Sequence, residues 1–264
     1  MRTVFVIGIG AGSPQHVTLE AIAALRQTDV VLAFDKGEVK EDLLALRREI
    51  LAAHAPHVPL VTMVDPPRDR QPKQYVGEVK RWLHARSELL QEALLEHVPE
   101  SGAAAILVWG DPSLYDSTLR ILANMQTQVR VKVIPGITAI QALTAAHAIP
   151  LNRIASDITI TTGRQFPDTY NKDNCVVMLD GGAAWRTCTD PDAYIWWGAY
   201  LGMEYEVTRA GFIREIGEDL ERLKQSLRDQ HGWIMDIYLV RILTQEEASS
   251  SSLRRTAEAG GFVA

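Results

Sequence analysis

The loop Gly8–Pro14, with the sequence Gly-Ile-Gly-Ala-Gly-Ser-Pro, lies between a predicted strand and a predicted helix. Small residues at such a position let the backbone approach a ligand at the carboxyl ends of parallel strands. Asp35 follows the next predicted strand, where its carboxylate could accept the ribose hydroxyls of a dinucleotide. The spacing Gly-x-Gly-x-x-Gly, however, needs glycine where the chain has Ser13, and Pro14 distorts the loop. A tight turn without a ligand therefore stays open as an alternative, with Asp35 as a solvated acid.

Two further loops of the same kind follow later predicted strands. In the first, Gly110 lets the backbone pass close to a ligand, and Pro112 stiffens the turn after Asp111. In the second, Thr138 and Ala139 lie at a predicted helix start, where free N–H groups and a hydroxyl suit a carboxylate or a ribose. Each loop also has a purely structural interpretation, as a β-turn and as a helix cap.

The cysteines and histidines form no metal or disulfide pattern. The 264 residues include two cysteines, Cys175 and Cys188, without a Cys-x-x-Cys motif, and seven histidines without metal-ligand spacing. We therefore expect neither a metal site nor a disulfide scaffold, and we expect a reducing, cytoplasmic location. The histidines are interpreted as surface or capping residues.

Charge and hydropathy exclude several classes of protein. A formal net charge of −6 gives no global basic field, so nucleic acid is not an expected partner, and an anionic ligand would need a local basic pocket. No apolar run reaches the roughly 18 residues of a transmembrane helix, so we expect no membrane association. The apolar start of the chain carries three alternating glycines, which favour a buried strand over a signal peptide.

The first half of the chain alternates short apolar runs with helical patterns, as βαβ units around a parallel sheet do. Strands are predicted at Val4–Gly8, Asp29–Phe34, Val58–Val61, Ala103–Trp109 and Val129–Ile134. Helices are predicted at Val17–Leu25, Lys40–Ala53, Tyr75–His97, Thr118–Met125 and Ile137–Ala146.

The second half has fewer helices per strand, which indicates a mixed sheet. Strands are predicted at Ile158–Thr161, Val176–Leu179, Tyr194–Trp197, Met203–Val207 and Trp233–Arg241, and one helix at Glu215–Asp229. The fold class is therefore α/β, with two α/β domains. Their expected limits are an N-terminal domain 1–147, a linker 148–156, a C-terminal domain 157–245 and a flexible tail 246–264.

Taken together, three segments carry a resemblance to a known family: Gly8–Pro14 followed by Thr18-Leu19, Trp109–Tyr115, and Ile134–Ala139. In this order and spacing the chain resembles the tetrapyrrole methylases, the methyltransferases of corrin and sirohaem synthesis. Val31–Gly37 and Tyr194–Gly211 resemble the branch of aerobic cobalamin synthesis that methylates carbon 1 of a precorrin and releases acetate. The resemblance implies S-adenosylmethionine bound in a cleft between two α/β domains, without a metal.

The resemblance also implies which residues contact the methyl donor. They are Ala11, Gly110, Asp111, Pro112, Leu114, Tyr115, Thr138, Ala139, Met178, Leu179, Ala199 and Tyr200. Many relatives have proline at the position of Ala11. The nucleophile in such a transfer is the substrate's own carbon, so the protein mainly supplies alignment and exclusion of water.

The implied substrate is a polycarboxylate, which basic residues would have to meet. Candidates are Lys36, Arg47, Arg48, Arg68, Arg70, Arg153 and Arg164, most of them expected to be ordinary surface charges. Release of acetate needs a general base, for which we choose Asp35, with Lys36 beside it to keep it ionised or to polarise the carbonyl. Asp35 could equally serve only to order its own loop.

Other functions stay open on the sequence alone. They are a tetrapyrrole methylase of different carbon specificity, a ribosomal RNA methylase of the same fold, a nicotinamide-dependent reductase that uses Gly8–Gly12 and Asp35, and a tetrapyrrole carrier without catalysis. The expected partner is a precorrin, and a homodimer is expected from the resemblance.

Overall fold

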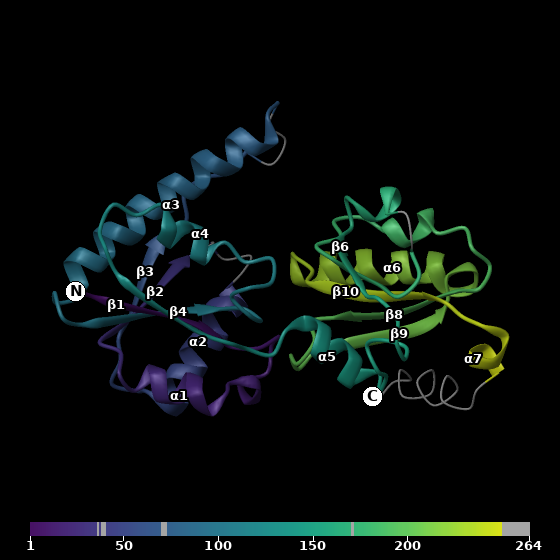
Figure 1. Ribbon diagram of the computed structural model, residues 1–264, viewed down its shortest axis with the longest axis horizontal. Coiled ribbons are helices and arrows are strands. Elements are labelled where there is room, and N and C mark those ends of the chain that lie inside the picture. Colours follow the sequence, from purple (N-terminus) through teal and green to yellow (C-terminus); the bar gives the residue numbers. More distant parts are fainter. Residues whose placement is uncertain (36, 38–40, 70–72, 170–171, 250–264) are drawn as a thin grey trace. The chain divides into compact units, whose positions relative to one another are not determined.

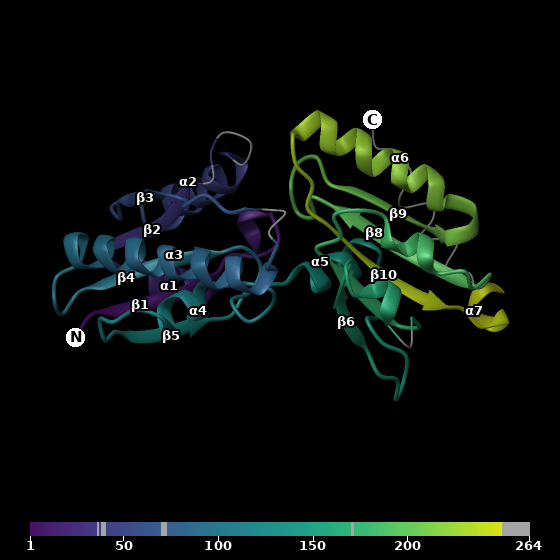
Figure 2. The ribbon, with the colours of Figure 1, turned by 90° about the horizontal axis from the view of Figure 1, so that it is seen from above.

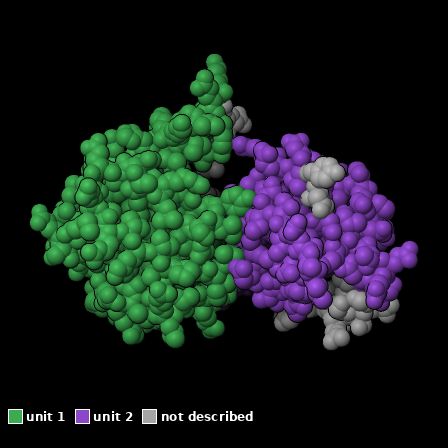
Figure 3. Space-filling model, in the orientation of Figure 1, with its two compact units in different colours: residues 1–138 green, residues 139–264 purple. Residues whose placement is uncertain are grey.

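The computed structural model describes residues 1–35, 37, 41–69, 73–169 and 172–249. The chain divides into two compact units, residues 1–138 and residues 139–264, which are coloured separately in Figure 3. Each unit contains one five-stranded sheet with helices packed on it.

The sheet of the first unit is entirely parallel, with the strand order β3-β2-β4-β1-β5. Its strands are β1 (Thr3–Gly8), β2 (Val30–Asp35), β3 (Leu60–Val64), β4 (Ala103–Val108) and β5 (Arg130–Ile134). The central strands are nearly continuous apolar runs, as expected for parallel strands that helices cover on both faces. The parallel sheet predicted from the sequence is confirmed.

Helices cover both faces of this sheet: α1 (Leu19–Leu25) and α2 (Glu41–His54) lie on one face, and α3 (Tyr75–His97) and α4 (Thr118–Ala123) on the other (Figure 1). Alternate residues of β1 divide between the two resulting cores. Phe5 and Ile7 pack with residues of α1 and α2, whereas Val4 and Val6 pack with residues of α3 and α4. This two-sided burial fixes where each strand ends, and so where the loops after the strands lie.

The sheet of the second unit is mixed, with the order β6-β7-β10-β8-β9. Its strands are β6 (Thr159–Thr162), β7 (Cys175–Met178), β8 (Ala193–Ala199), β9 (Val207–Phe212) and β10 (Asp236–Ile242). Strand β10 runs antiparallel to both of its neighbours, and β6 pairs with β7 in parallel. The mixed sheet expected from the sequence is confirmed.

The helices of the second unit also lie on both faces of its sheet. Figures 1 and 2 show the long helix α6 (Ile213–His231) along one face, and α5 (Ala139–Ala146) packs against β8 and β10 on the other. Short helices occur at η1 (Pro14–His16) in the first unit and at η3 (Phe166–Asp168), η4 (Ala184–Thr187) and α7 (Gln245–Ser249) in the second. Helix α6 ends at His231, and Gly232 caps it with a φ of +71°, the left-handed conformation typical of a helix terminus.

One strand differs from the sequence-based expectations. The strand expected at Met203–Val207 is wrong, because Met203 and Glu206 form successive turns and β9 begins only at Val207. Helix α5 packs on strands of the second unit, and the sequence analysis had grouped it with the first domain. The domain limits drawn from the sequence stay a prediction.

Candidate functional site

In the first sheet, the neighbouring strands β1 and β4 are followed by connections that run toward opposite edges of the sheet. After β1 the chain crosses to β2 on one side, and after β4 it crosses to β5 on the other side, although β1 and β4 are neighbours. Open α/β sheets bind ligands at the carboxyl ends of strands at such a reversal. The loops that follow β1, β4 and β5 are the ones that the sequence singled out.

Glycines let these three loops cross in direct backbone contact. The Gly10 N–H donates to the Gly110 carbonyl at 3.3 Å, and the Gly110 N–H donates to the Gly10 carbonyl at 2.8 Å. A Cβ added at Gly136 would lie 2.3 Å from the Gly110 oxygen and 2.7 Å from the carbonyl carbon of Gly8. Any side chain at Gly136 would therefore push the backbones apart.

Asp111 ties the loop after β4 to the loop after β5. The side chain is 8% exposed, and one carboxylate oxygen accepts from the N–H and the hydroxyl of Ser113, at 2.8 and 2.5 Å. The other oxygen accepts from the Gly136 N–H at 2.8 Å. Burial raises the pKa of the Asp111 carboxyl, but these three hydrogen bonds outweigh it and hold the pKa below its usual value. The ionised carboxylate of Asp111 therefore connects the two loops by hydrogen bonds.

The space beside Gly110 is open. Its φ is +70°, and within the described part of the chain a Cβ added there would meet only the Cα of Thr138, at 3.9 Å. The loop also contains the β-turn foreseen for it, because the Leu114 N–H donates to the Asp111 carbonyl at 3.2 Å. Tyr115 is 44% exposed and has a positive φ of 51°. The structure thus brings the predicted loops after β4 and β5 together.

Ala11 lies in the crossing of the loops. It is 3% exposed, and its N–H donates to Nδ1 of His16 at 3.4 Å. A Cβ added at Gly10 would lie 2.1 Å from the Cβ of His16, so the imidazole sits directly over the glycine loop. Sequence reasoning had not assigned His16 this place.

The predicted residues of the second unit also meet at one edge. Because β7 and β8 are both antiparallel to β10, their carboxyl ends lie at the same edge of the sheet, and Ile237 pairs with Met178 on one side and with Gly198 on the other. Leu179 and Tyr200, the residues just past these ends, have positive φ values of 54° and 53°.

The side chains at this edge face different ways. Leu179 is 65% exposed, whereas Tyr200 is 1% exposed and its hydroxyl donates to the Trp233 carbonyl at 2.6 Å. The Tyr200 ring packs edge-on against Tyr205 and Trp233. A ligand at this edge would therefore meet the side chain of Leu179 but only the backbone of Tyr200.

Comparison with known proteins identifies the family. The profile of the Tetrapyrrole (Corrin/Porphyrin) Methylases matches residues 3–217. The chain belongs to the tetrapyrrole methylase family. Among curated proteins, it is 42% identical over 250 residues to a precorrin-6A synthase [deacetylating] from Sinorhizobium sp, which covers 91% of this chain and 95% of the relative.

Solved structures agree with this assignment. A cobalamin-synthesis-related protein (CobF) from Corynebacterium diphtheriae is 50% identical, with a TM-score of 0.83 over 92% of this chain and 100% of that one. A uroporphyrin-III C-methyltransferase from Thermus thermophilus, complexed with S-adenosylhomocysteine, is 19% identical with a TM-score of 0.57 over 90% and 97%. The latter likeness shows the shared fold.

In this tetrapyrrole methylase, Asp35 ends β2 on the far side of β4 from β1. Its side chain is exposed, and one carboxylate oxygen accepts from the Gly37 N–H at 2.8 Å. This is the loop-ordering hydrogen bond that was the structural alternative for Asp35. Lys36 lies outside the described residues, so the proposed pair of Asp35 and Lys36 stays a prediction.

A buried arginine that the sequence analysis missed fixes the backbone beside Asp35. Arg86 of α3 is 6% exposed, and its guanidinium donates to both carboxylate oxygens of Asp65 at 2.7 and 2.6 Å. The guanidinium also lies over the rings of Phe34 and Trp82, at 4.3 and 4.0 Å from their centroids. The Asp65 N–H donates to the Asp35 carbonyl at 3.0 Å, so this cluster holds the end of β2.

Two of the basic residues proposed to meet substrate carboxylates have structural partners instead. Arg47 donates through Nε and Nη2 to the Leu107 carbonyl at 3.1 and 2.9 Å, and burial lowers its pKa to about 10. Arg153 donates to Asp173 at 2.7 Å and to Glu247 at 2.6 Å. Both are thus engaged within the protein.

The other basic residues proposed to meet substrate carboxylates lie in different surroundings. Arg48 and Arg164 are exposed, and Arg70 lies outside the described residues. The guanidinium of Arg68 lies 5.2 Å from the ring centroid of Trp82. These side chains carry no assignment to a substrate.

His147 corrects the view that all histidines are surface or capping residues. It is 2% exposed, and its Nε2 lies 3.0 Å from the Trp197 carbonyl oxygen. Burial lowers its pKa below the usual histidine value, although the hydrogen bond to Trp197 opposes this.

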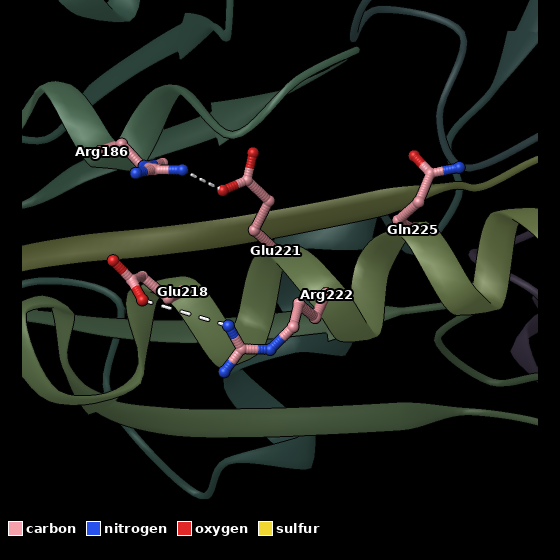
Figure 4. A pocket seen from close by; sticks show the side chains of 5 residues that line it. All are labelled: Arg186, Glu218, Glu221, Arg222 and Gln225. Atoms are coloured by element: carbon pink, nitrogen blue, oxygen red, sulfur yellow. Dashed lines mark hydrogen bonds and ion pairs between the residues drawn. The ribbon is translucent and has the colours of Figure 1, made fainter.

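A surface hollow of about 470 Å³ lies on α6, and none of the predicted site residues lines it (Figure 4). Its lining consists of long polar side chains, among them Arg186 and Glu221, which pair with each other. Small-molecule sites are mostly apolar with a few polar groups, so this hollow is a poor candidate for a ligand site.

The described residues contain neither a metal-binding cluster nor a membrane-spanning helix. In that part of the chain, no group of three His, Cys, Asp or Glu residues is arranged to hold a metal ion. None of its helices is long and apolar enough to cross a membrane.

Proposed function

We propose that this tetrapyrrole methylase transfers a methyl group from S-adenosylmethionine to carbon 1 of a precorrin and releases acetate. The observation that carries the proposal is the 42% identity, over nearly the whole of both chains, to a precorrin-6A synthase [deacetylating]. The backbone crossing at Gly8, Gly110 and Gly136 supports it, because it leaves open space beside Gly110 at the edge where α/β sheets bind ligands.

The donor would meet both predicted edges of the protein. In the first unit, the open side of Gly110 and the hydroxyl of Thr138 would receive its polar parts. In the second unit, the exposed side chain of Leu179 would cover the adenosine. That one donor molecule contacts both edges stays a prediction from the family resemblance.

The chemistry needs alignment more than a reactive side chain. When bound, the sulfonium donor supplies the methyl group and the precorrin supplies the carbon nucleophile, and the protein holds the two in line. Release of acetate requires an activated water, for which Asp35 is the proposed general base. Its exposed position at the end of β2 and its braced backbone are compatible with this role.

One reaction tests the proposal and separates it from the alternatives. The purified protein would be incubated with methyl-labelled S-adenosylmethionine and the precorrin, and both labelled corrinoid and free acetate would be measured. We expect the two products in equal amounts. Methylation without acetate would indicate a methylase of different carbon specificity. Binding of the precorrin without turnover would indicate a carrier, and turnover only with a nicotinamide cofactor would indicate a reductase.

Assembly and location remain part of the proposal. The homodimer expected from the family resemblance would be tested by light scattering on the purified protein. The cytoplasmic location expected from the two unpaired cysteines, both of which are buried, would be tested by cell fractionation.

A further inference from the structure

A buried cluster of charged residues lies behind the ligand edge of the second unit. The side chains of Lys224 on α6 and Asp236 on β10 are 4% and 3% exposed, and Nζ of Lys224 lies 2.8 Å from Oδ2 of Asp236. The same ammonium donates to the backbone carbonyl of Asp180 at 2.6 Å. Lys224 therefore contacts two segments that are far apart in the sequence.

The first segment is the turn that follows β7. The Asp180 carboxylate accepts from the N–H groups of Gly182 and Ala184 at 2.9 and 2.8 Å, and from the Tyr238 hydroxyl at 2.9 Å. A Cβ added at Gly163 would lie 2.5 Å from the Asp180 side chain, so Asp180 packs closely against the backbone of Gly163. Asp180 directly follows Leu179, the exposed residue with positive φ.

The second segment is the start of β10, which pairs with the end of β8. Asp236 pairs in the sheet with Ala199, and its carboxylate accepts from Nε1 of Trp197 at 2.9 Å. Burial raises the pKa of the Asp236 carboxyl, and the contacts with Lys224 and Trp197 oppose this shift. The Lys224 ammonium thus joins the end of β7 to the end of β8 across the first residue of β10.

A buried ion pair is a poor device for stability alone. Removing two charges from water costs several kcal/mol, on the order of what their attraction returns, and apolar replacements of similar volume are often as stable. Leu179 also holds a left-handed backbone conformation, which costs about 1–2 kcal/mol and persists only where its surroundings enforce it. The arrangement therefore favours a role in geometry.

We infer that Lys224 is a positioning residue for the methyl donor, because it fixes the Met178–Leu179 and Ala199–Tyr200 segments relative to each other. The inference rests on the proposed function, in which these segments contact the adenosine. Lys224 lies too deep to touch a ligand itself. It acts through the backbone that it holds.

The test begins with a double variant that leaves no unpaired charge at positions 224 and 236. Lys224→Met with Asp236→Leu replaces the ion pair by apolar side chains and removes the bond to the Asp180 carbonyl. We expect this double variant to fold and to bind S-adenosylhomocysteine about tenfold more weakly in calorimetry. We expect the KM for S-adenosylmethionine to rise by the same factor, with kcat changed less.

Tyr238→Phe provides a milder second variant. It removes one hydrogen bond to Asp180 and leaves the ion pair intact. We expect about threefold weaker binding, and this variant decides the question if the double variant does not fold. Unchanged affinity in the folded variants would overturn the inference while leaving the proposed function standing.

The matched control is Arg153→Met. Arg153 also bridges segments of the second unit, but it bonds to the carbonyl of Ile242, at the opposite end of β10. We expect lower stability and unchanged affinity. An equal loss of affinity in this control would show a general loosening of the unit and would overturn the inference. Failure of the wild-type protein to bind S-adenosylhomocysteine would overturn both the inference and the proposed function.

Discussion

Substitutions at Gly110 and Gly136 should separate stability from ligand binding. Gly110→Ala places a side chain at a φ of +70°, which costs about 1–2 kcal/mol for a residue other than glycine. The added Cβ clashes with none of the described residues, since its nearest neighbour among them is the Cα of Thr138 at 3.9 Å. The expected loss of about 1 kcal/mol corresponds to a Tm lower by about 2–4 °C.

Gly136→Ala should cost more stability than Gly110→Ala. Its Cβ would lie 2.3 Å from the Gly110 oxygen and 2.8 Å from the Cα of Gly8, and neither backbone atom is able to rotate away as a side chain does. Overpacking of this kind costs roughly 1–3 kcal/mol, and more where the backbone has to shift. We therefore expect a loss of about 3 kcal/mol.

Gly110→Leu should reduce the affinity for the donor strongly while reducing the stability of the fold only a little. Its stability should fall about as far as that of Gly110→Ala, because the backbone strain is the same. Its side chain would extend into the open space beside Thr138, so affinity for S-adenosylhomocysteine should fall by more than about 100-fold, or roughly 2.7 kcal/mol. The assays are chemical denaturation and calorimetric titration of each variant.

Gly37→Ala is the control for backbone strain. Its φ is +81°, and among the described residues an added Cβ has no neighbour within 4 Å, so Gly37→Ala should lose similar stability without losing donor affinity. The reasoning is refuted if Gly110→Leu binds within about twofold of the wild type. Equal destabilisation by Gly110→Ala and Gly136→Ala would refute the conclusion that the three loop backbones are in direct contact at Gly136.

Three further predictions concern other parts of the chain. Asp35→Asn should leave methyl transfer intact and slow acetate release at least about tenfold in a single turnover; normal acetate release would exclude the base role. Tyr200→Phe should cost about 1–3 kcal/mol, because it leaves the buried Trp233 carbonyl without its donor, while donor affinity stays within twofold; calorimetry and denaturation together check this. The hydrogen bond with Arg153 lowers the pKa of Glu247 to about 2 from 4.5, so the contribution of this ion pair to stability is complete above pH 4.5 and is lost as the pH falls toward 2. Glu247→Gln should therefore flatten the decline in Tm between pH 4.5 and 2, and an unchanged slope would contradict this.

The sequence predicts well the strands and helices whose apolar residues follow directly from which of their faces are buried. The first strand is a continuous apolar run, and α3 is long, amphipathic and free of proline, and both appear where expected. Strand β9 was misplaced because all six of its residues are half-buried and its sequence, Val-Thr-Arg-Ala-Gly-Phe, has no alternation. Its position depends on pairing with β8, which a local pattern does not encode.

The sequence predicts the loops of the site, but it does not predict the buried side-chain contacts that hold those loops in place. The loops around Gly10, Gly110 and Gly136 carry small residues because backbones meet there, and the sequence shows this directly. The contact of Arg86 with Asp65 spans 21 positions and exists only once α3 has packed beside β3. The pattern around Lys224 did hold a clue, since this lysine occupies the apolar stripe of α6 together with Leu220 and Leu227.

The central position of β10 has a consequence for how the protein is made. The strands of the first sheet are complete at Ile134, whereas the second sheet lacks its middle strand until Ile242 has left the ribosome. The second neighbour of β10, β8, is complete at Ala199, and at about 5–20 residues per second synthesis of the roughly 40 residues from there to Ile242 takes about 2–9 s. During that time β7 and β8 each present an unpaired apolar edge, the kind of surface that aggregates. Chains stalled before Asp236 should therefore show a protease-resistant first half and a protease-sensitive second half that depends on chaperones to stay dispersed.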